Sequence, residues 1–166
     1  IDLDVLQDYY RKFLNPFIYQ YDITENEKQS SIQLRFDEEN FCHLLGIESI
    51  VKYSVSKKEI HHYKGQGGWD YIQNTGLCFN DLKRMNKSKF KSIKAKFVYF
   101  YLMPDILFYT KDENAIIHLG IKKDETLGYY IPKTFFVEKI GEDGVDIYID
   151  KQEKIIATKK NRVIML

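Results

Sequence analysis

The spacing of apolar side chains predicts an amphipathic helix at the start of the chain. Residues 1–17 place Val5, Leu6, Tyr9, Tyr10, Phe13 and Leu14 at the three- and four-residue intervals of one helical face. Asp2 and Asp4 stand at the end of this helix where its dipole favours negative charge. Asn15 and Pro16 are expected to end it, because proline cannot continue a helix.

The next segments predict a β-hairpin followed by a short helix. Residues 17–23 and 31–36 are rich in aromatic and β-branched side chains, and the polar stretch TENEKQS separates them. Asp37 then stands where a helix cap belongs, and Gly46 suits the left-handed conformation that closes a helix. We therefore expect a hairpin over residues 17–36 and a helix over residues 38–45.

The middle of the chain is predicted to be mainly helical. GWDYIQNTG and FNDLKRMN have the composition of two short helices around Gly76, while the glycines of KGQGG indicate a turn before Trp69. From residue 87 onward, an apolar stripe at helical spacing predicts a longer helix that Pro104 interrupts. The stripe consists of Phe90, Ile93, Phe97, Phe100 and Tyr101.

The last third of the chain is typical of β-strands. Strand-like runs cover residues 115–121, 127–140, 145–150, 154–158 and 162–166, with turn signals between them. The whole order predicts an α+β fold with an N-terminal helix and β-hairpin, a helical middle and a C-terminal antiparallel β-meander. Because 166 residues with 44% hydrophobic content suit one core, we expect a single domain over residues 1–166.

Charge is balanced over the chain but concentrated in one segment. The 25 Lys and Arg against 24 Asp and Glu exclude a globally basic nucleic-acid coat protein. Residues 82–96 nevertheless carry seven cations, and no acid follows before Asp105. This pattern favours contact with a phosphate backbone, the alternative being a solvated lysine face. The nucleic-acid-binding candidates are Lys83, Arg84, Lys87, Lys91 and Lys94.

The sequence gives little support for a membrane protein, a secreted protein, a metal-binding protein or an enzyme with one of the common glycine motifs. No apolar run reaches the roughly 18 to 20 residues needed to span a bilayer, and no signal-peptide pattern opens the chain. Cys42 and Cys78 lie too far apart for a metal-binding pair, and no histidine has zinc-ligand spacing. We expect a cytoplasmic protein without membrane association, metal ion or cofactor. Phosphate-binding, dinucleotide and hydrolase glycine motifs are also absent from the sequence.

Two histidines are candidates for chemistry. His43 lies beside Leu44 and Leu45, where a histidine packed in the core is the usual alternative to a catalytic one. His118 lies within the strand-like run AIIHLGI, so the register of that strand decides whether its ring points inward or outward.

Three short motifs occur in a distinctive order: FCHLLGI after the helix and hairpin, GLCFNDL before the basic helix, and YYIPKTFF on a late strand. Together they resemble the phage- and mobile-element-associated nuclease-like domains of the barnase–EndoU–colicin–RelE superfamily, over residues 43–136. The resemblance implies a compact α+β fold and the activity of a metal-independent ribonuclease or toxin. It also places the histidine of the HLLG pattern on His43 and a hydroxyl residue before paired aromatics on Thr134.

Cleavage of RNA without a metal ion needs a base for the 2′-OH proton, an acid for the leaving oxygen, and cations for the phosphate. His43 suits the base or the acid, and His118 is the candidate for the second titrating group. Thr134 suits a hydrogen bond to a phosphate oxygen. Charge and position add Arg35 and Lys133 as cations that neutralise the phosphate.

Two functions therefore remain open. The first is a metal-independent ribonuclease or toxin-like nuclease of a phage or mobile element, with RNA as substrate and an immunity protein as partner. The second is a non-catalytic accessory or inhibitor protein that binds a host protein or nucleic acid. A plain interaction domain is a third alternative.

Overall fold

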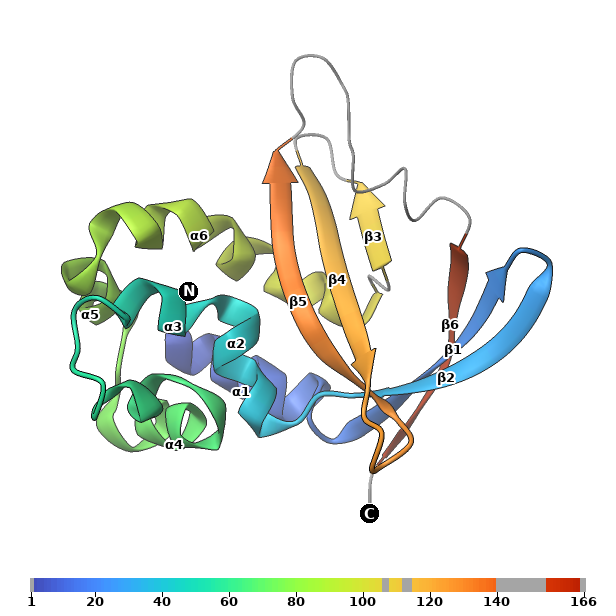
Figure 1. The fold of residues 1–166 in the computed structure, drawn as a ribbon, viewed down its shortest axis with the longest axis horizontal. Helices are drawn as coiled ribbons and strands as arrows, with labels where there is room; N and C mark the ends of the chain where they lie inside the picture. The colour runs from blue at the N-terminus through green and yellow to red at the C-terminus, as the bar shows by residue number, and fades with distance from the viewer. Residues whose placement is uncertain (1, 106–107, 112–114, 140–154, 165–166) are drawn as a thin grey trace. The chain divides into compact units, whose positions relative to one another are not determined.

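The computed structural model describes residues 2–105, 108–111, 115–139 and 155–164, and it confirms the α+β class (Figure 1). The chain divides into two compact units, each of which is described by itself. The helical unit consists of Ile1–Pro16 and Phe36–Tyr101, and the sheet unit consists of Phe17–Arg35 and Leu102–Leu166. The single domain over residues 1–166 stays a prediction.

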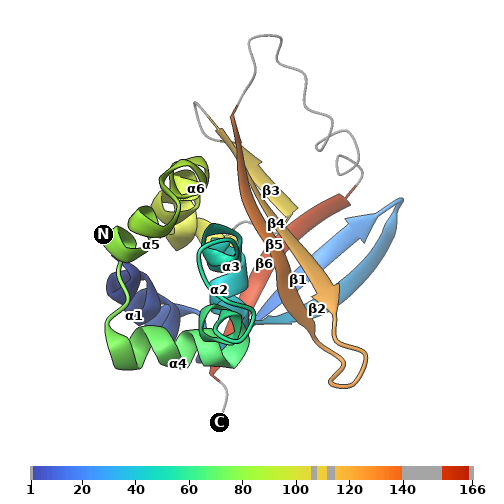
Figure 2. The same cartoon turned by 60° about the vertical axis from the view of Figure 1, so that its left-hand side comes forward.

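In the helical unit, the short helices α2 and α3 lie among the other four α-helices (Figure 2). The α-helices are α1 Leu3–Phe13, α2 Phe41–Leu45, α3 Ile47–Val51, α4 Gly65–Thr75, α5 Phe79–Met85 and α6 Lys87–Tyr99. Short 3-10 helices cover η1 Glu38–Asn40, η2 Ile60–Tyr63 and η3 Phe100–Asp105. Among the described residues, no helix has both the length and the apolar composition needed to cross a membrane.

A cluster of aromatic rings forms the core of the helical unit. The Tyr10 ring of α1 lies 5.3 Å from Phe41 and 5.6 Å from Trp69, centroid to centroid, and Phe41 and Trp69 are 5.2 Å apart. The Tyr10 hydroxyl donates a 2.7 Å hydrogen bond to the carbonyl of Asp37. Burial raises the pKa of Tyr10 well above its usual value, so this phenol remains a neutral donor. The cluster joins α1, α2 and α4.

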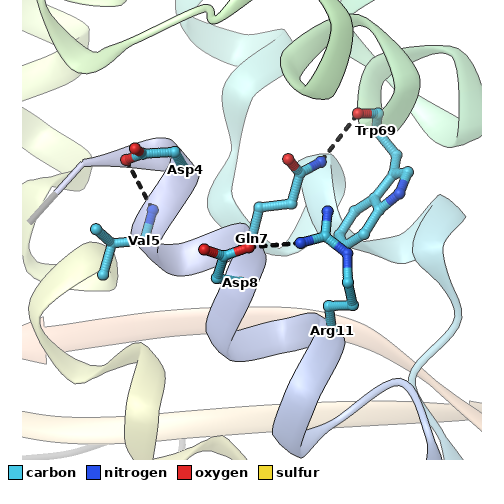
Figure 3. Close-up of polar contacts among 6 residues, drawn as sticks. All are labelled: Asp4, Val5, Gln7, Asp8, Arg11 and Trp69. Carbon is cyan, nitrogen blue, oxygen red and sulfur yellow. Dashed lines mark hydrogen bonds and ion pairs between the residues drawn. The ribbon is translucent and has the colours of Figure 1, made fainter.

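Polar groups support the same contact between α1 and α4 (Figure 3). The buried Gln7 side chain donates a 2.9 Å hydrogen bond to the carbonyl of Trp69. One turn later, the Arg11 guanidinium lies 5.4 Å from the centre of the Trp69 ring and pairs with Asp8. The predicted first helix is therefore confirmed, and both its apolar face and two of its polar side chains hold it in place.

The predicted turn at KGQGG is wrong, because these glycines form the first turn of α4. A Cβ atom at Gly68 would lie 2.6 Å from Cys42 Sγ, and one at Gly67 would lie 2.6 Å from the His61 carbonyl oxygen. The glycines therefore allow α4 to approach α2 and η2 more closely than a side chain would permit.

Among its described residues, the sheet unit has six strands in the order β3-β4-β5-β2-β1-β6 (Figure 1). They are β1 Phe17–Glu25, β2 Lys28–Arg35, β3 Phe108–Lys111, β4 Ala115–Lys123, β5 Tyr130–Lys139 and β6 Ile155–Ile164. All neighbours pair antiparallel except β2 and β5, which pair parallel through Leu34 and Tyr130.

The predicted hairpin is confirmed, but its strands are longer than expected. Most of the polar stretch TENEKQS belongs to β1 and β2, and Asn26 and Glu27 alone form the turn, both with positive φ. A two-residue turn of this kind matches the right-handed twist of the flanking strands. Polar side chains here mark a solvated hairpin end rather than a loop.

The C-terminal strands differ from the predicted meander in two respects. The strands β3, β4 and β5 do follow one another antiparallel, but β6 pairs with β1 at the other end of the sheet. The described parts of the two predicted strands at 154–158 and 162–166 belong to one strand, β6, whose register against β1 shifts between Gln20 and Tyr21. The predicted strand at residues 145–150 lies outside the described residues.

We expect Phe41→Ala to lower the free energy of unfolding by about 3–5 kcal/mol, because it removes a fully buried ring from the aromatic cluster. Phe13→Ala is the matched control, since that ring is 47% exposed. Urea unfolding followed by circular dichroism measures both values. Equal losses in the two variants would contradict the assignment of this cluster as the core.

Candidate functional site

The sheet unit brings two of the candidate residues, His118 and Thr134, onto one face of the β4–β5 pair. His118 is the Cα partner of Phe136, and Gly120 is the partner of Thr134. Because side chains alternate along a strand, residues 134, 136 and 138 share one face with residue 118. Thr134 Oγ1 lies 3.3 Å from the position of a Cβ atom at Gly120, so the glycine leaves room for the hydroxyl.

The register of β4 turns the His118 ring inward. The side chain is buried, its ring stacks on Phe136 at 4.2 Å between centroids, and Nε2 lies 3.2 Å from Glu138 Oε2. A carboxylate at one imidazole nitrogen fixes the orientation of the ring. Only 1% of the residue is exposed, so the ring is enclosed on this face of the sheet.

Lys133 and Thr134 are both exposed and lie at an irregularity of the sheet. The register between β4 and β5 shifts between Gly120 and Ile121, whose partners are Thr134 and Pro132. Lys133 therefore lies at the bulge itself. Bulges redirect side chains, and this one lies where an exposed lysine and an exposed threonine follow one another in the chain. Such a pair suits the binding of a phosphate oxygen.

Arg35, at the end of β2, is held by a neighbouring aromatic ring. Its guanidinium lies 4.4 Å from the centre of the Tyr129 ring, and Nη1 donates a 2.8 Å hydrogen bond to the Tyr129 hydroxyl. The stack and the hydrogen bond together fix a planar cation.

The sheet unit also contains a polar groove of about 580 Å³. It is lined by β1, β2 and the connection from β4 to β5, and its polar side chains include Gln20, Ser31, Gln33, Lys123 and Tyr130. Amides and hydroxyls offer both donors and acceptors, as sugars and bases require. Sequence reasoning missed these residues, because alternating polar side chains on a hairpin have the pattern of an ordinary solvated face.

His43 lies in the helical unit, whereas Arg35, His118, Lys133 and Thr134 lie in the sheet unit. In α2, the other four residues are buried and His43 alone is exposed. The structure therefore excludes the alternative of a core histidine at this position. An exposed imidazole is accessible for proton transfer to a bound substrate.

Five candidate cations lie on α5 and α6, and we call them together the basic face: Lys83, Arg84, Lys87, Lys91 and Lys94. All five are exposed, while Ile93 and Phe97 of α6 are buried. Arg84 has a partner in Asp81, with 3.6 Å between Nη1 and Oδ1. Of the predicted apolar stripe, Ile93 and Phe97 of α6 are buried and Phe90 is half-buried, whereas Tyr101 lies beyond α6 and is exposed.

Lys96 belongs to the same sequence cluster but not to this surface. It is half-buried, and a Cβ atom at Gly46 would lie 3.3 Å from its Nζ. Burial, together with the nearby Lys89, lowers the pKa of Lys96. Among the described residues, no three His, Cys, Asp or Glu side chains gather as a metal site requires.

We expect charge reversal at Lys87, Lys91 and Lys94 to weaken binding of single-stranded RNA and to flatten its dependence on salt. Each lost phosphate contact reduces the slope of log K against log salt by about 0.7, so three contacts reduce it by about 2. Fluorescence anisotropy over a salt series measures the slope.

The matched control reverses Lys12, Lys57 and Lys58, which are exposed elsewhere in the helical unit and carry the same charge. An equal change of slope in the two triple variants would show that only net charge matters, and would contradict a localised nucleic-acid surface.

Comparison with known proteins gives one match. A family model described as "phage-Barnase-EndoU-ColicinE5/D-RelE like nuclease4" matches residues 3–163. No curated protein and no solved structure matches the chain. The matched range includes the basic face and all five candidate catalytic residues. It confirms the resemblance that the three sequence motifs indicated.

Proposed function

The chain belongs to this family of phage-associated, barnase–EndoU–colicin–RelE-like nucleases, and we propose that it is a metal-independent endoribonuclease. Membership in the family supports nuclease activity. RNA as the substrate, cleavage without a metal ion, and a toxin role for a phage or mobile element are the further steps of the proposal.

The observation that best supports the proposal is the exposure of His43. Its four neighbours in α2 are buried, so the backbone around the imidazole is held in place while the ring faces solvent. An imidazole ring has two nitrogen atoms, one of which can accept a proton while the other can donate one. This is the property that metal-free RNA cleavage requires of its acid or base.

The proposed reaction includes two proton transfers, one from the attacking oxygen and one to the leaving oxygen. A base takes the proton of the ribose 2′-OH, and the 2′-oxygen forms a bond to the adjacent phosphorus. The bond from phosphorus to the 5′-oxygen breaks, and an acid protonates that oxygen. The products are a 2′,3′-cyclic phosphate and a 5′-hydroxyl. We assign His43 to one of the two proton transfers.

The residues of the sheet unit have separate roles in the proposal. Thr134 donates a hydrogen bond to a non-bridging phosphate oxygen of the bound RNA, and Lys133 and Arg35 neutralise phosphate charge on the sheet unit. Because His118 is buried against Phe136 and Glu138, we propose it as a positioning residue for this face rather than as the second titrating group.

We expect the purified chain to cleave RNA in EDTA and His43→Ala to lower the rate by about 10²- to 10⁴-fold, the usual effect of losing a general acid or base. His61→Ala is the matched control, since His61 is another exposed histidine of the helical unit. Gel analysis of a labelled RNA measures the rates.

The same assay tests the sheet unit with Thr134→Val and its control Thr126→Val, both at exposed threonines. A loss in Thr134→Val alone supports the phosphate contact. Cleavage that strictly needs Mg²⁺, or that His43→Ala leaves unchanged, would contradict the proposed mechanism.

A second function is favoured by one feature of the helical unit. An apolar hollow of about 240 Å³ lies between Phe79, Phe90, Phe97 and Val98, with Lys94 beside it. Such a surface suits a non-catalytic accessory or inhibitor protein that binds a host protein. For this function, charge reversal on the basic face should abolish the cellular effect, and His43→Ala should leave it intact. A ribonuclease should instead lose its effect in His43→Ala.

A further inference from the structure

The helical unit contains a second hollow, which none of the candidate catalytic residues lines. Its volume is about 580 Å³, within the range of small-molecule sites. It lies between the segment after α3, η2, α4 and α5. We call it the α4–α5 pocket, and the side chains that matter here are Tyr63, Tyr71, Thr75, Asp81 and Arg84.

Aromatic rings form one wall of the α4–α5 pocket. Tyr71 stacks on His62 with 4.7 Å between centroids, and Tyr63 meets Tyr71 edge to face at 5.4 Å. Burial and a hydrogen bond with Tyr71 raise the pKa of Tyr63 to about 12, so its hydroxyl stays neutral at physiological pH. The wall thus offers π-surface together with neutral hydroxyl groups, a combination suited to a planar polar ligand.

Opposite charges line the α5 side of the pocket. Asp81 Oδ2 accepts hydrogen bonds from the backbone N–H of Cys78 at 3.0 Å and from its thiol at 3.2 Å. These bonds, together with Arg84, lower the pKa of Asp81, so the carboxylate is ionised. Arg84 lies 3.6 Å from the other carboxylate oxygen, and its side chain is 79% exposed. The pocket therefore presents an acceptor and a donor side by side.

This combination discriminates between possible ligands. A bound phosphate would meet the Asp81 carboxylate, and like charges repel. A nucleobase instead has a flat face for stacking and an edge that carries both donors and acceptors. The side chains of the pocket therefore suit a base better than a phosphate.

Arg84 of the pocket lies on α5, and α5 packs against α6, the helix that carries Lys87, Lys91 and Lys94. We propose that the α4–α5 pocket binds an unpaired nucleobase of an RNA strand whose phosphates lie along the basic face. This inference rests on the proposed function and names the substrate class as single-stranded RNA. Recognition of RNA by stacked, unpaired bases is the general way in which proteins read single strands.

The test compares two 2′-O-methyl oligonucleotides of equal length and charge, one with bases and one abasic. Neither has the free 2′-OH that the proposed cleavage requires, so binding is measured without cleavage. We expect the intact chain to bind the oligomer with bases at least about tenfold more tightly, since stacking contributes to that oligomer alone. Tyr71→Leu and Thr75→Leu should each remove most of this difference in affinity between the two oligomers. The affinity for the abasic oligomer should stay unchanged in both variants.

Matched controls are available for both variants. Tyr53→Leu changes an exposed tyrosine of the same unit, and Gln73→Leu changes an exposed position on α4 itself; neither residue lines the pocket. Both controls should keep the tenfold difference. Thr75 is an exposed helix position, so Thr75→Leu keeps the test valid even if Tyr71→Leu fails to fold.

Equal affinity of the intact chain for the two oligomers would contradict the proposal that the pocket binds a base. A difference in affinity that survives Thr75→Leu would contradict it as well.

This result can be distinguished from the result of the nuclease assay. Cleavage in EDTA without base-dependent binding would contradict base binding by the pocket alone. Base-dependent binding without cleavage would support base binding by the pocket and contradict the ribonuclease proposal.

Discussion

The position of His43 depends on the packing of its neighbours in α2. Phe41 is buried against Tyr10 of α1 and Trp69 of α4, and Cys42 fits beside Gly68, where no side chain stands in the way. Burial raises the pKa of the Cys42 thiol to about 12, so this residue packs as a neutral group. A helix of only five residues has little stability of its own, and these contacts decide which side faces solvent.

Burial of apolar side chains likewise decides which side of α6 carries its exposed lysines. The burial of Ile93 and Phe97 fixes the rotation of α6, so that Lys87, Lys91 and Lys94 project into solvent. The chain as a whole carries a formal charge of only +1, so attraction of a polyanion is local to this surface. Screening confines such attraction to about 8 Å at physiological salt, which makes contact with the backbone, rather than long-range steering, the main contribution.

Local patterns in the sequence were enough to predict the first helix, the hairpin, α5 and α6, because their signals lie within neighbouring residues. Other features depend on distant parts of the chain. The helical state of Gly67 and Gly68 follows from the close approach of α4 to α2 and η2, and the pairing of β6 with β1 joins segments more than 130 residues apart in sequence. Neither can be predicted from composition, which favoured a turn and a meander.

The surroundings of the candidate residues were also beyond prediction from local sequence. The exposure of His43 and the burial of His118 depend on helix rotation and strand register, and a single sequence leaves both open. The polar groove of the sheet unit and the α4–α5 pocket are lined by residues from three or more segments. Residues such as Tyr71 and Gln33 therefore carried no signal in the sequence, although the family and its nuclease class did.

In the proposed reaction the 2′-hydroxyl of RNA is the nucleophile, and no metal ion activates it. A single 2′-deoxynucleotide at a mapped cleavage position tests this step when the reaction is followed in EDTA. We expect cleavage at that position to stop while neighbouring sites are still cut to 2′,3′-cyclic phosphates. Continued cleavage at the deoxynucleotide, or products with 5′-phosphates, would contradict it.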